Sequence, residues 1–195
     1  MKKQQILDWI EKYGDITKRI CEEEGIPYQI CWAQAILESG SGTNVLARNN
    51  NLWGIKYRSK YHSRFVRKWT WEYLKKGKVK VFSKFAAWDT LEEGTRGYCQ
   101  FLKRKRYLHD NLQKISSDPL KYLIWIWGRG YATARGYVPA WVKRMQKIYT
   151  ATGNEDFNVD YCAHLQVAVE ILREKTSTER KHLVEIFLDE GIFLT

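Results

Sequence analysis

Glu38 is the residue whose type and position best suit chemistry. It ends a largely apolar run, residues 30–37, in which Gln34 is the one clearly polar side chain. We therefore expect a helix that is buried on every face. Apolar neighbours and the negative end of the helix dipole both disfavour a carboxylate anion at its last turn, so a raised pKa is expected. A carboxyl group that stays protonated near neutral pH can act as a general acid.

The residues after Glu38 end the expected helix and begin a loop. In the Ser-Gly-Ser-Gly stretch 39–42, one glycine can take a left-handed C-cap conformation and the other allows a close approach of backbone or ligand. The loop leads to Asn50, Asn51 and Trp53. An acid, hydrogen-bonding amides and an indole ring together suit a sugar. Taken alone, however, a glutamate before such a stretch is more often a solvated helix end.

Several separated motifs carry a resemblance to a known family. They are Ala33-Gln34-Ala35, Leu37-Glu38-Ser39-Gly40, Asn50-Asn51-Leu52, Gly54-Ile55-Lys56 and Tyr131-Ala132-Thr133. In this order they resemble the peptidoglycan-hydrolysing N-acetylglucosaminidases of glycoside hydrolase family 73, which are related to the muramidase domain of flagellar rod proteins. The resemblance runs from about residue 5 to residue 152. It implies a mainly α (α+β), lysozyme-like domain, a β-hairpin lobe bordering the active-site cleft, and cleavage of the β-1,4 bond between N-acetylglucosamine and N-acetylmuramic acid.

Residues 60–88 are expected to form that β-lobe. Two runs of aromatic and β-branched residues with partial alternation flank Lys75-Lys76-Gly77-Lys78, which predicts a hairpin with a glycine turn. Glu72 falls on the first strand close to the turn. Read in isolation, it is as readily a cross-strand partner for a lysine. The resemblance implies a second acidic residue of the site at this position.

The resemblance also suggests roles for individual residues. It places Glu38 as the acid that protonates the glycosidic oxygen. The expected substrate-binding residues are Asn50, Asn51, Trp53, Tyr131, Thr133 and Tyr137. Glu72 would activate a water and give inversion, or the acetamido oxygen of the substrate would attack, oriented by Tyr131 or Tyr137. Ala134 stands where the family usually has an aspartate, so the subsite contribution of that carboxylate is missing.

The net charge points to an anionic partner. A formal charge of +11 on 195 residues is large, and nucleic acid, anionic lipid and acidic wall polymers would all be attracted. Together with the resemblance, we expect peptidoglycan glycan strands as the partner, no nucleic acid, no membrane insertion and a monomer. The alternative hypotheses are a muramidase or lytic transglycosylase of lysozyme-like fold, and a non-catalytic module that binds cell wall or nucleic acid.

No metal or other cofactor is expected. The cysteines, Cys21, Cys31, Cys99 and Cys162, lie in apolar helical contexts without CxxC spacing, which indicates reduced, buried thiols. The four histidines form no ligand motif with them. Four tryptophans in helical apolar patterns are assigned to the core, namely Trp9, Trp32, Trp125 and Trp127.

The remaining pattern predicts a glucosaminidase domain over residues 1–153 and a C-terminal helical hairpin over 154–195. Residues 3–24 predict two short helices or one kinked helix, interrupted at Gly14-Asp15. Asp89 is expected to cap a helix that ends near Lys105, and Asp118 to cap another. Amphipathic patterns over 161–175 and 178–190 are expected to pack on the main domain.

The first fifteen residues contain no continuous apolar stretch of the kind found in a secretory signal, and no later stretch approaches a membrane-spanning length. A protein that acts on the cell wall would then stay cytoplasmic until a phage lysis pore releases it, or be part of a virion. A signal removed from the sequence would look the same.

Overall fold

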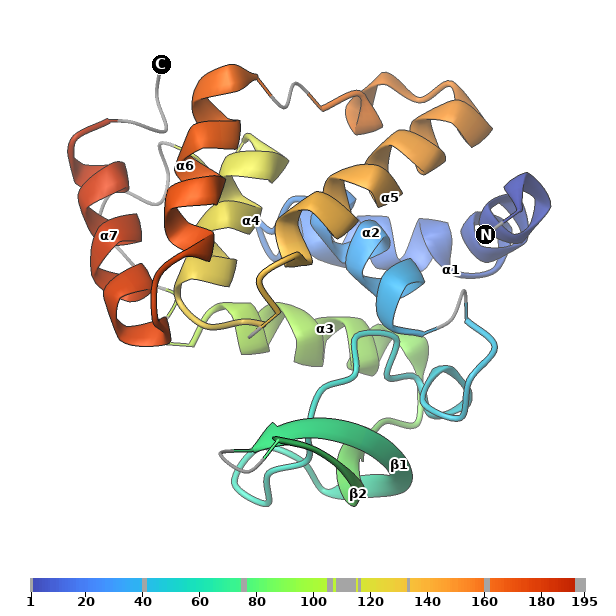
Figure 1. Cartoon of the computed structure of the whole chain (residues 1–195). Helices are drawn as coiled ribbons and strands as arrows, with labels where there is room; N and C mark the ends of the chain where they lie inside the picture. The colour runs from blue at the N-terminus through green and yellow to red at the C-terminus, as the bar shows by residue number, and fades with distance from the viewer. Residues whose placement is uncertain are drawn as a thin grey trace.

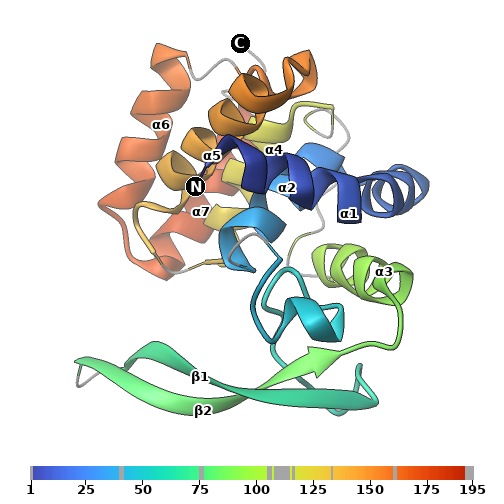
Figure 2. The ribbon, with the colours of Figure 1, turned by 90° about the vertical axis from the view of Figure 1, so that its right-hand side faces the viewer.

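The computed structural model describes residues 2–39, 42–74, 77–104, 107, 115, 117–132, 134–159 and 162–191, with side chains except at 72–74, 77–78 and 164. In chain order the elements are α1 (Lys3–Glu23), α2 (Tyr28–Glu38), the 3-10 turn η1 (Ala47–Asn49), β1 (Arg64–Leu74), β2 (Gly77–Ala87), α3 (Leu91–Leu102), α4 (Pro119–Gly128), α5 (Tyr137–Thr152), η4 (Glu155–Phe157), α6 (Ala163–Arg173) and α7 (Ser177–Asp189). The helices gather in one body, and the hairpin lies along one side of it (Figures 1 and 2). The predicted mainly α fold with a small β-lobe is confirmed.

Helix α2 lies at the centre of the helical body. All its residues from Ile30 to Ile36 are buried, because α1, α4 and α5 pack around it. Trp32 on α2 meets Trp9 on α1 edge to face, with ring centroids 5.8 Å apart. The four tryptophans assigned to the core are buried as predicted. A helix enclosed in this way has little freedom to move, so its last residue is held firmly.

Helix α1 is one continuous helix of 21 residues, so of the two predicted alternatives the pair of separate helices is wrong, and the kinked helix remains. Gly14 is buried inside the helix. A Cβ at this position would lie 3.1 Å from Cζ2 of Trp32. Glycine at position 14 therefore allows the Trp32 ring to approach the helix backbone closely, and it does not end the helix.

Two helix starts were predicted from their capping residues. Asp118 caps α4 as expected, since its Oδ1 accepts hydrogen bonds from the backbone N–H groups of Leu120 and Lys121 at 2.9 and 3.1 Å. Helix α3 begins one residue later than predicted. Thr90, not Asp89, is its N-cap and forms a capping box with Glu93. The helix ends at Leu102, three residues before the expected position.

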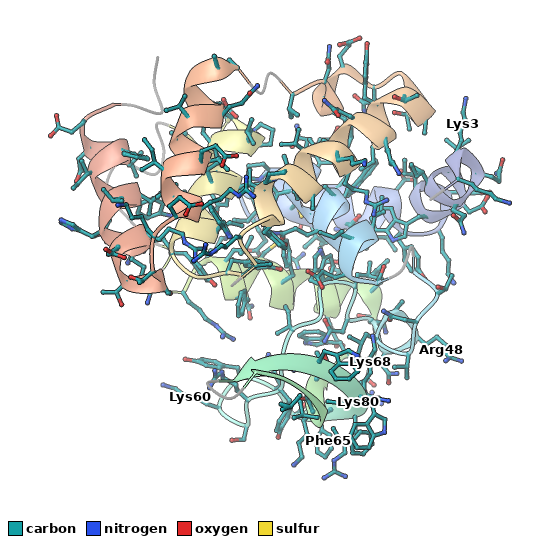
Figure 3. All side chains as sticks on the ribbon, in the orientation of Figure 1. Lys3, Arg48, Lys60, Phe65, Lys68 and Lys80 are labelled. Atoms are coloured by element: carbon teal, nitrogen blue, oxygen red, sulfur yellow. The ribbon has the colours of Figure 1, made fainter. Side chains whose placement is uncertain are left out.

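The predicted hairpin is confirmed, with β1 and β2 antiparallel and in register from Arg64↔Ala87 to Leu74↔Gly77. Its two faces differ. Trp69, Trp71 and Phe82 share one face and are 56%, 56% and 54% exposed. On the other face, Phe85 is buried. Figure 3 places Lys68 on the side toward the helices and Phe65 on the far side.

The C-terminal helices pack on the body, as their amphipathic patterns predicted. Val184 of α7 contacts α4 so closely that a Cβ on Gly128 would lie 2.7 Å from its Cγ1. Leu165 and Leu172 of α6 belong to the same hydrophobic core as α2. This packing fixes the position of α7 relative to the turn that follows α4.

All four cysteines are free thiols. Cys21, Cys31 and Cys99 are buried as predicted, whereas Cys162 is half-buried. Among the described residues, none of the helices is both long and apolar enough to span a bilayer.

Candidate active site

The carboxyl group of Glu38 lies in a cavity of about 330 Å³. Helix α2 ends at this residue, so the carboxyl group stands where the buried helix meets solvent. The walls come from residues 53–58, from the end of α3 at Phe101 and Arg104, and from the turn after α4 at Tyr131 and Ala132. Three segments far apart in the sequence therefore converge on one carboxyl group.

Burial raises the pKa of Glu38, as the sequence predicted, and the positive charge of Lys68 opposes this with a smaller effect. The side chain is exposed to solvent by area. It nonetheless lies within a concave surface, where surrounding protein atoms replace much of the water that would stabilise the anion. The carboxyl group is therefore accessible to a ligand, and its surroundings also disfavour ionisation.

The segment after Glu38 is tied back to α1 and α2. Ser39, which is the C-cap, donates its hydroxyl to the carbonyl oxygen of Ala35 and accepts the N–H of Gly42 at 2.8 Å. Gly42 has φ +82°, and a Cβ there would lie 2.6 Å from the Tyr13 ring. This is the close approach that the glycine pair predicted. Gly40, the candidate for the left-handed cap, lies outside the described residues.

Asn51, which the sequence predicts to bind substrate, is not among the residues that line the cavity. It is 0% exposed. Its Nδ2 donates to the carbonyl oxygens of Ile55 at 2.9 Å and Ala86 at 2.8 Å, and its Oδ1 accepts the N–H of Ile55 at 2.9 Å. The amide therefore clamps the cavity wall to the base of β2. A fully buried side chain whose groups are bonded to the backbone has none to offer a sugar.

Asn50 has a similar structural role. It takes a left-handed conformation, with φ +55°, which asparagine tolerates better than most residues. Its Nδ2 donates to the carbonyl oxygen of Trp88 at 3.0 Å, and its own carbonyl is packed against Gly94 of α3. Asn50 thus joins the loop to the segment that follows the hairpin, and like Asn51 it is absent from the cavity wall.

Trp53 lines the cavity but is only 3% exposed. Its ring stacks on Tyr98 at a centroid distance of 4.6 Å, and its Nε1 donates to the carbonyl oxygen of Cys31 at 3.0 Å. One face of the indole is therefore occupied by the core. The next residue, Gly54, has φ +65°, and a Cβ on it would lie 3.9 Å from Oε2 of Glu38.

Tyr131 lines the cavity, and its ring is 5.9 Å from that of Tyr137, which is buried behind it. Burial raises the pKa of both phenols, and the charge of Glu38 adds to the increase at each. Both hydroxyls thus lie in the field of the carboxyl group. Thr133 and the side chain of Glu72 lie outside the described residues; the backbone of Glu72 pairs with Val79 in the hairpin.

Cationic side chains border the cavity, and sequence reasoning missed them. Lys56, Arg58 and Arg104 line it, and Lys68 acts on Glu38 from β1. Lys56 belongs to a motif already noted, but its charge was not used. Arg104 was hidden in the basic run 103–106, which is typical of a solvated helix end. Three cations around one carboxyl group whose pKa is raised favour a substrate that carries negative charge.

Among the described residues, no group of three histidine, cysteine, aspartate or glutamate side chains is arranged to hold a metal ion. The groups that do surround the cavity are a carboxylic acid, tyrosines and cations. This set suits acid-catalysed cleavage of a bond in a polar, anionic substrate.

Comparison with solved structures identifies the fold. The catalytic domain of the autolysin Auto from Listeria monocytogenes is 24% identical, with a TM-score of 0.61 over 76% of this chain and 86% of that one. The glycoside hydrolase domain of FlgJ from Salmonella typhimurium is 20% identical, with a TM-score of 0.58 over 78% and 92%. At these identities the likeness shows the fold alone, which is lysozyme-like.

The family follows from the sequence match. Residues 14–151 match the glucosaminidase family model, described as mannosyl-glycoprotein endo-beta-N-acetylglucosaminidase. The chain belongs to the glucosaminidase family of glycoside hydrolases. It is also 27% identical over 144 residues to the peptidoglycan hydrolase FlgJ of Pseudomonas aeruginosa, a match that covers 70% of this chain and 36% of that protein. The chain therefore spans about a third of the length of this relative.

Proposed function

We propose that the protein hydrolyses bacterial peptidoglycan at the β-1,4 bond between N-acetylglucosamine and N-acetylmuramic acid, with Glu38 as the general acid. The observation that carries the proposal is the position of Glu38, whose pKa is raised by burial at a solvent-filled cavity in a glucosaminidase-family chain. The family membership and the likeness to the peptidoglycan hydrolase FlgJ support peptidoglycan as the substrate. The protein would act on the cell wall, as a monomer.

In the first step the carboxyl group of Glu38 donates its proton to the glycosidic oxygen as the bond to the anomeric carbon lengthens. A neutral acid is required here, and a raised pKa keeps more of it protonated at neutral pH. Positive charge then develops on the sugar ring and must be met by a carboxylate, a water or the substrate itself.

Two routes can complete the reaction. In one, Glu72 activates a water for a single inverting displacement. Position 72 lies four residues beyond Lys68 on β1, and the charge of Lys68 acts on Glu38; this electrostatic contact between β1 and Glu38 supports the assignment. In the other, the acetamido oxygen of the substrate attacks, and Tyr131 beside Glu38 orients it.

Fragment analysis tests the proposal directly. Purified peptidoglycan is digested with wild-type protein and Glu38→Gln, and the released fragments are analysed by mass spectrometry after reduction of the new ends. N-acetylglucosamine at the reducing ends is the expected result, with no release by Glu38→Gln. Muramic acid at the ends would indicate a muramidase instead, and anhydromuramic acid a lytic transglycosylase.

Product stereochemistry separates the two routes. If Glu72 is the base, the fresh product has the inverted anomeric configuration by proton NMR, and Glu72→Gln slows the reaction by about 100-fold, the usual contribution of a general base. A retained configuration, with a much smaller effect of Glu72→Gln, would favour attack by the acetamido group.

A non-catalytic binder is the remaining alternative, because a chain with a charge of +11 attracts polyanions. Such a module would bind peptidoglycan or DNA without releasing fragments. Affinity for DNA equal to that for cell wall, with the steep salt dependence of phosphate contacts, would support it.

A further inference from the structure

A second cavity, of about 290 Å³, lies where the turn after α4 meets the start of α7. One side is formed by Trp127, Gly128, Gly130, Ala132 and Arg135, and the other by Lys175, Thr176, Ser177 and Arg180. The second segment follows the part of the chain that matches the family model, which ends at residue 151. The C-terminal helices therefore complete this cavity. The proposed catalytic steps involve no residue of these helices.

Three cations line this cavity, namely Arg135, Lys175 and Arg180, and no carboxylate does so among the described residues. Two carboxylates lie nearby. Glu174 is 4.0 Å from Arg135 in a largely exposed pair, and Glu179 is held in the capping box of α7. The three cations that line the cavity outnumber these two carboxylates, so the local excess of charge is positive.

Arg180 is the most informative of the three. It is 6% exposed, and its guanidinium lies over the Trp127 ring at 4.4 Å. Its Nε has no hydrogen-bond partner among the described residues. Burial, and then the charge of Arg135, lower the pKa of Arg180. A buried guanidinium with an unpaired donor, facing a second cation, is costly unless an anion joins them.

The backbone adds to the attraction. Helix α7 has 13 residues and begins at Ser177, which lines the cavity. Thr176 Oγ1 accepts the N–H of Glu179 at 3.3 Å, and the other N–H groups of the first turn, which lack partners within the helix, carry partial positive charge that favours an anion. The unpartnered Arg180 and the helix start are independent features that lie at the same cavity.

The two cavities adjoin, because Ala132 lines both of them. A strand bound across Glu38 would therefore bring its side groups to Arg135, Lys175 and Arg180. We propose that this second cavity binds a carboxylate of the peptide stem carried by the muramic acid residue of the strand in the cleft. The inference rests on the proposed function for its substrate. Its chemistry is the bidentate pairing of arginine with a carboxylate.

The test measures binding, so that it does not depend on cleavage. In a Glu38→Gln background, the double variant Arg135→Gln/Lys175→Gln is titrated by calorimetry with glycan strands that carry stems and with strands whose stems have been removed. Lys143→Gln is the control, because Lys143 is an exposed cation on α5 that lines neither cavity. We expect affinity for stem-bearing strands to fall about tenfold, with stem-free strands and the control unchanged.

Equal losses on both strands, or no loss, would overturn the proposal. Arg180→Lys, which keeps the charge but not the planar fork, should weaken only the stem-bearing complex. Direct titration with free stem peptide tests the cavity independently of cleavage. If wild-type protein releases no fragments but still binds this peptide, the proposed function fails and the proposal for the second cavity stands. A glycerol phosphate polymer is the competitor: if it displaces the strands and free stem peptide does not, the ligand is a phosphate and the carboxylate assignment fails.

Discussion

Helix α2 and the β1–β2 hairpin carry the two carboxylates of the proposed reaction, and they are built in opposite ways. Helix α2 is enclosed by other helices, so the position and pKa of Glu38 are set by the core. The hairpin is bonded at its base to the loop 49–57 and exposes Trp69 and Trp71 on one face. The difference indicates that the group needing a tuned pKa is placed on the rigid element, whereas the hairpin is held mainly at its base.

The largest expected effect comes from the rigid side of this comparison. Replacing Glu38 by Gln removes the proton donor but keeps the size of the side chain. Because a general acid typically contributes 10² to 10⁴ in rate, we expect peptidoglycan release to fall by about that factor. The rate is measured by turbidity and by released reducing ends. Glu11→Gln, an exposed carboxylate on α1, should leave the rate unchanged, and equal rates for both variants would refute the role of Glu38.

The next effect concerns the junction between the two regions. Asn51→Ala removes three hydrogen bonds to the backbone of Ile55 and Ala86. Each buried group left unpaired costs about 1 to 3 kcal/mol, so we expect the free energy of unfolding to fall by about 3 kcal/mol. Urea unfolding measures it. Asn158→Ala, which removes an exposed amide, is the control, and a loss no larger than that of the control would show that the clamp is unimportant.

The same two regions explain how far the sequence could predict the structure. The burial of α2 and the alternation of the hairpin are local patterns, so both elements and the raised pKa of Glu38 were predictable. The role of Asn51 was not, because its partner Ala86 lies 35 residues away and an amide looks equally suited to a sugar. Arg104 was missed because only the tertiary fold distinguishes a cation at a cavity from one in a solvated basic run.

Some errors came from ambiguity within the sequence itself. Asp89 and Thr90 are both good N-cap residues, and each is followed three residues later by a glutamate, so only the backbone decides between them. Of the cations of the second cavity, Arg135 lies 40 positions before Lys175 and 45 before Arg180 along the chain. No local pattern connects Arg135 to Arg180, and the packing of α7 on α4 is what brings them together.

A smaller effect should appear in the pH dependence of stability. The folded-state pKa of Glu38 is raised by burial, so its contribution to stability is present below the unfolded pKa and is lost as the pH rises through the folded pKa. Gln does not ionise, so it carries no free-energy cost of holding a buried charge at high pH. We therefore expect the Tm of Glu38→Gln minus that of wild type to be more positive at pH 8 than at pH 4. Thermal unfolding at both pH values measures it, and a difference that is the same at both would mean that Glu38 is not desolvated.

The smallest effect is expected on the outer face of the hairpin. Trp69 is 56% exposed and packs against Phe82 at 5.0 Å, so Trp69→Ala removes little buried surface. Surface changes of this kind usually alter stability by no more than about 0.5 kcal/mol, whereas Trp53→Ala, which empties a buried site against Tyr98, should cost about 3 to 5 kcal/mol. Urea unfolding of the two variants compares the regions directly. A loss for Trp69→Ala close to that for Trp53→Ala would mean that the outer face is buried in solution, and the contrast between a hairpin held at its base and an enclosed helical body would no longer hold.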